Sequence, residues 1–257
     1  PMLYVTPSLK AKGPLQAEAA AWAASLGATF VTRQKRTVPE LWQAYGEDNL
    51  LVYTTQGPVI ERPEGRHFFS LNMAELRIQN LRRGEPDHLL EAFGATGPVR
   101  LLDCTCGFGA DSIVASFGLP AGSTVEALEA IPQMAAVTGW GFRHFVHEKD
   151  DVTAALRRIS LTCGTYGDYL AQAGRDYDII YFDPMFQKPV AGSCQFTPVR
   201  DLLDHDALTA ETIRLALMRA AKVVVKGRFL KKLVAAFPQA ALHGGRYSRV
   251  RYAVIER

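Results

Sequence analysis

The chain has 257 residues, of which 48% are hydrophobic and 21% are charged, and this balance excludes a disordered or fibrous protein. A formal net charge of +3 permits an anionic partner without requiring one. No window reaches the roughly eighteen uninterrupted apolar residues of a membrane span. Because four cysteines occur without a secretory leader before them, we expect a reduced, cytoplasmic protein.

Residues 1–66 predict a small α/β module without recognisable chemistry. Apolar residues alternate or recur with helical spacing in six short segments. These are strands at Met2–Val5, Thr29–Thr32, Leu50–Thr54 and Pro58–Glu61, and helices at Pro14–Leu26 and Val38–Tyr45. A break at Pro63-Glu64-Gly65 follows, and residues 67–97 are expected to form a bridging helical segment with one helix at Ala74–Arg83.

From residue 98 to residue 257 the pattern becomes strand, turn and helix, repeated. The expected strands are Val99–Asp103, Thr124–Glu129, Ile159–Thr162, Asp178–Phe182 and Lys222–Lys226, and the expected helices are Ala110–Phe117, Pro132–His147, Tyr166–Ala171 and Leu208–Arg219. Strands alternating with helices imply a parallel sheet covered on both faces. Residues 240–255, broken at Gly244-Gly245, add two strands as a hairpin. The sequence therefore predicts a Rossmann-like, mostly parallel sheet of seven strands with a terminal antiparallel hairpin.

A glycine-rich turn follows the first strand of this domain. Gly107-Phe108-Gly109 lets the backbone approach a ligand closely and opens a helix whose first amides face that ligand. A nicotinamide fingerprint would need a third glycine where Ser112 stands. Asp103 would repel a pyrophosphate but attract the ammonium and sulfonium of S-adenosylmethionine (SAM). The residues predicted to bind the cofactor here are Asp103, Thr105, Gly107, Gly109 and Asp111.

Two later strand ends complete the predicted cofactor site. Glu129 lies about twenty residues after the glycine turn, where an acidic side chain accepts hydrogen bonds from both ribose hydroxyls of an adenosine ligand. The alternative for Glu129 is a solvated carboxylate at a strand end. Gly164 and Thr165 follow the third strand, where such folds contact an adenine, and Thr165 could equally cap the next helix.

The tetrapeptide Asp183-Pro184-Met185-Phe186 follows the fourth strand and is the strongest functional signal. A carboxylate and a nearby backbone carbonyl accept hydrogen bonds from an exocyclic amine, and an aromatic ring stacks on the base that carries it. We therefore predict Asp183, Pro184 and Phe186 as the catalytic group. The alternative is a strand-end aspartate that caps a turn before proline.

Together with the glycine turn and the strand Val223-Val224-Val225-Lys226, this tetrapeptide resembles the RsmJ-like family. The resemblance covers residues 98–252 and implies a class I SAM-dependent methyltransferase domain that methylates guanine N2 in small-subunit ribosomal RNA. It also implies ribosomal RNA, or the small subunit, as the partner. Cysteines at Cys104 and Cys106 replace the alanines typical of the family, a small-for-small change. The segment Asn72–Arg77 is similar to uncharacterised bacterial homologues.

The remaining predictions concern the substrate side. Candidates for RNA contact share a place near the mouth of the site and are Met185, Lys188, Arg200, Lys226 and Arg228. Lys226 could bind phosphate or pair with Asp183. No metal site is expected, because Cys104-x-Cys106 has one residue too few between its thiols for a usual zinc motif. The alternatives are a methyltransferase of a small molecule or protein side chain, and a non-catalytic RNA-binding module.

Overall fold

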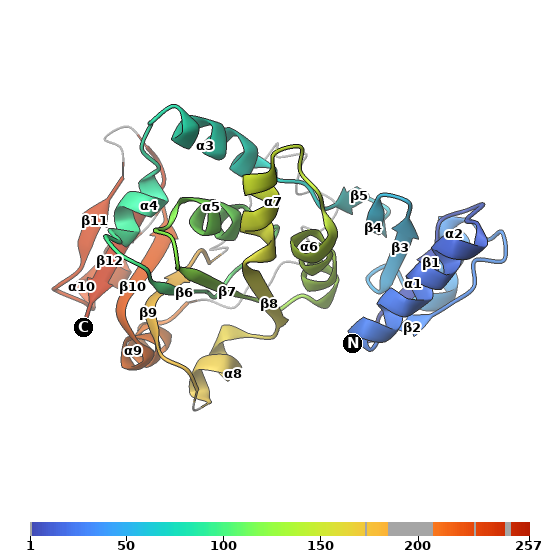
Figure 1. Cartoon of the computed structure of the whole chain (residues 1–257). Helices are drawn as coiled ribbons and strands as arrows, with labels where there is room; N and C mark the ends of the chain where they lie inside the picture. Colours follow the sequence, from blue (N-terminus) through green and yellow to red (C-terminus); the bar gives the residue numbers. More distant parts are fainter. Residues whose placement is uncertain (1, 173, 185–207, 229, 245–247) are drawn as a thin grey trace. The chain divides into compact units, whose positions relative to one another are not determined.

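The computed structural model describes residues 2–172, 174–184, 208–228, 230–244 and 248–257 (Figure 1). The chain forms two compact units. Unit 1 contains, among these residues, 2–70 and 131–141, and unit 2 contains the others. No helix in the described part of the chain is long and apolar enough to cross a membrane. The predicted boundaries at residues 66 and 97 stay a prediction.

Unit 1 is built on a five-stranded sheet in the order β2-β1-β3-β4-β5. Strand β1 pairs in parallel with β2 and β3, whereas β3, β4 and β5 pair antiparallel in succession. Its elements are β1 (Tyr4–Pro7), α1 (Gly13–Leu26), β2 (Thr29–Phe30), α2 (Val38–Tyr45), β3 (Leu50–Thr54), β4 (Gly57–Arg62) and β5 (Gly65–Phe68). Helix α2 begins at a capping box, in which the Thr37 and Glu40 side chains bond each other's backbone amides.

The core of unit 1 includes the first part of α6 (Pro132–His144). The Trp140 indole Nε1 donates to the Tyr53 hydroxyl at 3.2 Å, and that hydroxyl donates to Glu18 at 2.7 Å. Gly57 lies against the same indole, because a Cβ added there would stand 2.6 Å from its ring. Gly141, one residue along the helix, lies directly against the Phe69 ring. Two glycines thus allow aromatic rings to pack against backbone.

Unit 2 contains a seven-stranded sheet in the order β11-β12-β10-β9-β6-β7-β8. Strands β10, β9, β6, β7 and β8 are parallel, and β12 pairs antiparallel with both β10 and β11. The strands are β6 (Arg100–Asp103), β7 (Thr124–Glu129), β8 (Ile159–Cys163), β9 (Tyr177–Phe182), β10 (Ala220–Gly227), β11 (Ala241–His243) and β12 (Arg251–Glu256). The predicted mostly parallel sheet with a terminal antiparallel hairpin is confirmed.

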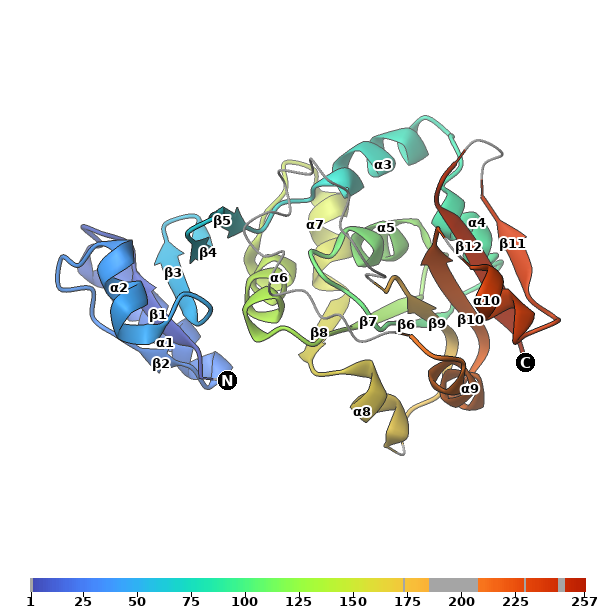
Figure 2. The same cartoon turned by 180° about the vertical axis from the view of Figure 1, so that it is seen from behind.

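Helices cover both faces of this sheet. Figure 2 shows α4, α5 and α7 on one face and α8 and α9 on the other. The helices of unit 2 are α3 (Met73–Arg82), α4 (His88–Phe93), α5 (Ala110–Gly118), α7 (Asp150–Arg157), α8 (Tyr166–Ala171), α9 (Ala210–Arg219) and α10 (Lys231–Ala235). The two-faced coverage predicted from alternating strands and helices is present.

Several short elements differ from the sequence-based expectation. The sequence did not predict β5, α4, α7 or α10, and α6 ends at His144 rather than His147. The chain leaves α6 because His147 turns into a local network: its amide donates to Thr153 Oγ1 and its ring accepts from the Lys149 amide, both at 2.9 Å. Helix α4 begins because Asp87 caps it, accepting from the Leu89 and Leu90 amides.

The alternation of side chains along the strands of unit 2 separates polar from apolar residues. Leu102, Phe182 and Val225 are buried in one apolar cluster with residues of α9. Their neighbours in sequence, Asp103, Tyr181 and Lys226, point to the opposite face, because successive strand residues alternate. Asp103 pairs with Tyr181 across β6 and β9. The register therefore collects ionisable side chains on one face, near the carboxyl ends of parallel strands.

We predict that Gly141→Ala lowers the free energy of unfolding by about 1–3 kcal/mol, because the added methyl overlaps the Phe69 ring. Urea denaturation followed by circular dichroism measures the change. Gly167→Ala in α8 is the matched control, since a Cβ there meets no atom within 4 Å. The control should keep or raise stability, by up to about 1 kcal/mol. Equal stability of Gly141→Ala and the parent would contradict the packing of Phe69 on α6.

Candidate functional site

The glycine turn between β6 and α5 is held by the two strands beside it. The backbone amides of Cys104 and Cys106 donate to carbonyls of β9 and β7, each at 2.9 Å. Gly107 and Gly109 have φ values of +56° and +93°, a region that favours glycine. Both cysteine side chains are buried, and burial raises the pKa of each thiol well above its usual value. They therefore remain neutral and serve as small packing residues.

Asp103 is 1% exposed and stabilises the glycine turn through hydrogen bonds. Its carboxylate accepts from the Ser112 hydroxyl at 2.6 Å and from the Thr105 amide at 3.0 Å. Burial is the largest cause of a raised pKa for Asp103, about 7, and the nearby charges of Asp111 and Asp183 add to it. Both oxygens thus have partners within the chain, and the predicted cofactor contact of Asp103 stays a prediction.

Glu129 ends β7 and reaches across to the glycine turn. Its Oε1 accepts from the Gly107 amide at 2.9 Å, and its backbone carbonyl accepts from the Gly164 amide at 2.9 Å. The residue is 7% exposed. Glu129 therefore joins two of the segments predicted to surround the cofactor, the turn after β6 and the turn after β8.

The turn after β8 is open on one side. A Cβ placed at Gly164 would meet no atom within 4 Å. Thr165 caps α8, because its side chain accepts from the Asp168 amide at 3.2 Å. The capping role that the sequence allowed for Thr165 is therefore present, and its contact with an adenine stays a prediction.

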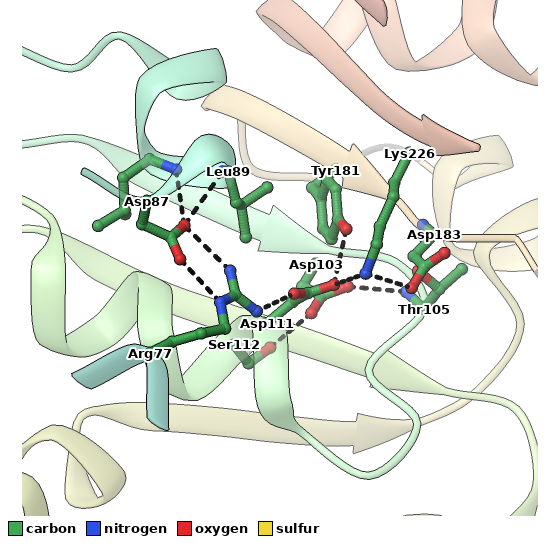
Figure 3. A network of polar contacts seen from close by, with 11 residues as sticks. Arg77, Asp87, Leu89, Asp103, Thr105, Asp111, Ser112, Tyr181, Asp183 and Lys226 are labelled. Carbon is green, nitrogen blue, oxygen red and sulfur yellow. Dashed lines mark hydrogen bonds and ion pairs between the residues drawn. The ribbon is translucent and has the colours of Figure 1, made fainter. Parts of the chain in front are cut away.

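Asp111, in the first turn of α5, is the centre of a network of polar contacts (Figure 3). Its Oδ1 accepts from Arg77 Nη1 at 2.7 Å, and its Oδ2 accepts from the Tyr181 hydroxyl at 2.7 Å. The ammonium of Lys226 lies 3.4 Å from the same Oδ2. Burial alone would raise the pKa of Asp111, but Lys226, Arg77 and Tyr181 outweigh it and lower the pKa below its usual value. Asp111 is therefore a buried carboxylate held in its charged form.

Arg77 of α3 connects this network to the next helix. Its Nε and Nη2 donate to the two carboxylate oxygens of Asp87 at 2.7 and 3.0 Å, in the bidentate geometry that binds most strongly. The two side chains are 19% and 8% exposed. Because Asp87 also caps α4, a single guanidinium fixes the starts of α4 and α5.

Asp183 follows β9 at the same sheet edge. Its backbone amide donates to Thr105 Oγ1 at 2.6 Å, and its Oδ2 lies 3.4 Å from Lys226 Nζ. The pKa of Asp183 is raised to about 6, chiefly by burial and also by the charge of Asp111, whereas Lys226 and Arg77 oppose the rise. The side chain keeps 34% exposure, so solvent reaches the carboxylate and limits the effect of burial. Within the network, the Asp183 carboxylate is more accessible to solvent than those of Asp111 and Asp87.

The other residues predicted for the substrate side are distributed unevenly. Pro184 is buried next to Asp183, and Arg228 is exposed after β10. Lys226 stands between the carboxylates of Asp111 and Asp183, which raise the pKa of its ammonium against the effect of burial. The predicted residues Met185, Phe186, Lys188 and Arg200 lie outside the described part of the chain.

The sequence did not point to three members of the network: Arg77, Asp87 and Tyr181. Tyr181 was hidden inside an apolar strand, and Arg77 within a cluster of basic residues. Two signals could have found them. Asp87 follows a proline and is a residue type that caps helices, and strand alternation places Tyr181 on the same face of the sheet as Asp103.

Comparison with known proteins agrees with this geometry. Residues 64–250 match a family model described as "Putative SAM-dependent methyltransferase". The "Uncharacterized protein YpiP" of Bacillus subtilis is 30% identical over 201 residues, which cover 78% of each chain. The "Ribosomal RNA small subunit methyltransferase J" of Rhodopseudomonas palustris is 30% identical over 145 residues, covering 54% of this chain and 63% of that protein.

A solved structure supports the same fold over nearly the whole chain. The SAM-dependent methyltransferase from Neisseria gonorrhoeae superimposes with a TM-score of 0.64 at 17% identity, covering 98% of this chain and 95% of that one. The seven-stranded sheet is thus the Rossmann-like sheet of class I methyltransferases. The chain belongs to the SAM-dependent methyltransferase family whose model it matches, and SAM is its cofactor.

The charges at this sheet edge suit that cofactor. Among the residues that the structure describes at this edge, the acids outnumber the cations Arg77 and Lys226. These acids are Asp87, Asp103, Asp111, Glu129 and Asp183. An excess of negative charge favours a ligand that carries an ammonium and a sulfonium. Helix α5 also begins at Gly109 without a capping side chain, so its first amides remain available to a polar ligand.

We predict that Glu129→Ala weakens binding of S-adenosylhomocysteine by about 2–4 kcal/mol, because the two hydrogen bonds predicted from the ribose hydroxyls to this charged acceptor would be lost. Titration calorimetry measures the dissociation constant. Glu129→Gln keeps an acceptor for the Gly107 amide, so a loss in this variant reports the ribose contact rather than a disturbed turn. Glu126→Gln, on the same strand and paired with Arg175, is the matched control. Unchanged affinity in both Glu129 variants would refute the ribose assignment.

Proposed function

We propose that this methyltransferase acts on an exocyclic amine of an RNA base, specifically guanine N2 in small-subunit ribosomal RNA. The observation that carries the proposal is the position of Asp183-Pro184 directly after β9. The Asp183 carboxylate is partly exposed and lies at the sheet edge that contains the glycine turn. Aromatic Phe186 follows two residues later in the sequence. An acceptor pair followed by an aromatic ring fits a planar base that carries an amine.

The similarity to a ribosomal RNA methyltransferase supports the same substrate class. The relative named for the small subunit matches over 145 residues, although this chain spans less than two thirds of that protein. Methylation of a small molecule or of a protein side chain would need the same cofactor site but no basic surface for phosphates. We therefore favour RNA.

The chain's own groups have modest tasks in this reaction. Bound SAM supplies an electrophilic methyl group, so the protein mainly has to align the nitrogen and accept its proton. In the proposed reaction the Asp183 carboxylate accepts a hydrogen bond from the amine, and the Pro184 carbonyl accepts a second one. As the new carbon–nitrogen bond forms and the sulfur–methyl bond breaks, the nitrogen gives up one proton toward Asp183. The bond from the Asp183 amide to Thr105 keeps this acceptor beside the glycine turn.

We predict that cells lacking this gene lose one N2-methylguanine in small-subunit ribosomal RNA. The parent gene should restore it, and Asp183→Asn should not, because the amide is a weaker acceptor. Mass spectrometry of nuclease digests locates the nucleotide. The purified Asp183→Asn protein should still bind S-adenosylhomocysteine within about twofold of the parent.

Asp176→Asn, an exposed aspartate on the loop before β9, is the matched control and should restore the modification. If ribosomal RNA is unchanged in the absence of the gene, RNA is not the substrate and the small-molecule or protein alternative takes its place. If Asp183→Asn loses cofactor affinity to the same extent as activity, Asp183 builds the cofactor pocket instead.

We predict that Lys226→Gln moves the acid limb of the rate profile to higher pH. Lys226 lowers the pKa of Asp183, so removing its charge raises that pKa above the parent's value of about 6. Activity that needs ionised Asp183 is lost as the pH falls through this pKa, so the loss begins at higher pH in the variant. Measurements of kcat/KM from about pH 5 to about pH 9 detect the shift. The exposed Lys231→Gln serves as control; an unmoved limb in Lys226→Gln would exclude the coupling.

A further inference from the structure

The described residues of unit 1 include seven lysines and arginines, and five of these lie in two loops. One loop follows β1 and the other follows β2, and these five cations, here called the basic face, are Lys10, Lys12, Arg33, Lys35 and Arg36. Strands β1 and β2 are parallel neighbours, so the loops after them emerge at the same edge of the sheet. Arg33 Nη1 donates to the Pro7 carbonyl at 3.2 Å and ties one loop to the other.

The basic face differs from the other cations of unit 1 in its partners. Arg62 and Arg66 each form an ion pair with a carboxylate. Within the described residues, the basic face has no ion pair, and the nearby Glu40 is engaged by the Thr37 capping box. Glu61 interacts with Arg33, and Glu40 with Arg36, through longer-range charge attraction. The positive charge of this face is therefore only partly offset by the acids described in the unit.

The two arginines are held by backbone rather than by acids. Arg33 Nε donates to the Arg36 carbonyl at 2.6 Å, and Arg36 Nε donates back to the Arg33 carbonyl at 3.1 Å. The Arg36 guanidinium also lies over the Tyr45 ring, 5.4 Å from its centre, and donates to its hydroxyl at 3.2 Å. These bonds orient the guanidiniums without cancelling their charge, so little side-chain entropy remains to be lost on binding an anion.

Two backbone features of the same loops also suit an anionic partner. Lys10, Gln34 and Lys35 have φ values of +65°, +53° and +61°, and they are three of the four non-glycine residues with positive φ in the described chain. Such strained conformations concentrate at binding sites. Lys12 begins the fourteen-residue helix α1 without a capping side chain and without an acid in the first turn, so the helix amides add to the positive potential.

We propose that the basic face binds the phosphate backbone of the RNA that carries the methyl acceptor, a proposal that rests on the proposed function. Regularly spaced phosphates match five cations without ion pairs on two loops better than a single small anion does. Three of the five, Lys10, Lys12 and Lys35, are exposed, and their side chains form no hydrogen bond with other described residues, so their charge can be removed without breaking the loops.

The test compares two triple variants of the full chain that lose the same charge. Lys10→Gln/Lys12→Gln/Lys35→Gln removes exposed cations of the basic face, and Gln34 shows that glutamine adopts the required positive φ. The control is Arg66→Gln/Arg83→Gln/Arg214→Gln, in which each arginine is 53–59% exposed and has a carboxylate partner. Fluorescence anisotropy with protein-free small-subunit ribosomal RNA, transcribed in vitro, gives the affinity at several salt concentrations.

We expect the basic-face variant to bind this RNA roughly tenfold to hundredfold more weakly at 0.1 M salt, and to lose about two units of the slope of log affinity against log salt. The control variant should bind RNA with the same affinity and salt slope as the parent. Both triple variants should bind S-adenosylhomocysteine as tightly as the parent does. If the parent binds and methylates RNA and the basic-face variant binds with the same affinity and slope, this inference is wrong and the proposed function stands. If the parent binds no RNA, both proposals fail.

Discussion

The described site depends on one buried carboxylate, Asp111, which holds its charge because three donors surround it. Arg77 comes from α3, Tyr181 from β9 and Lys226 from β10, so the first turn of α5 is tied to three other elements. Removing one partner of such a buried pair typically costs 3–5 kcal/mol, since an uncompensated charge remains. The geometry of the glycine turn, which immediately precedes α5, therefore follows from electrostatics as much as from its glycines.

Strand alternation explains why these charges can be buried at all. Each polar residue has an apolar neighbour in sequence that fills the opposite face of the sheet, as Tyr181 does beside Phe182 and Lys226 beside Val225. The apolar face secures the strands, and the register then brings the polar side chains together. The position of Asp183 is a consequence of the same register, because it directly follows Phe182, which pairs with Val225.

The strand ends could be predicted from the sequence because apolar runs and glycine turns are local signals. The fold class and the strand-end positions of Asp103, Glu129 and Asp183 came from such signals. The Arg77–Asp87–Asp111 network could not be found this way, because Arg77 and Asp111 are 34 residues apart and meet only after α3 packs on α5. Helix α4, which brings Asp87 into place, has six residues and too few turns for a periodic pattern.

The charge distribution also separates two demands that conflict. A cationic cofactor favours the carboxylate-rich edge of unit 2, where five acids lie near Arg77 and Lys226, whereas this edge would repel the phosphates of the proposed RNA substrate. Lys226 does little to offset this repulsion, because Asp111 and Asp183 already neutralise it. Under this proposal, the attraction for RNA comes from cations that form no ion pair. In the described chain, the loops after β1 and β2 meet that condition as a group, which gives the N-terminal unit a physical reason to accompany a methyltransferase sheet.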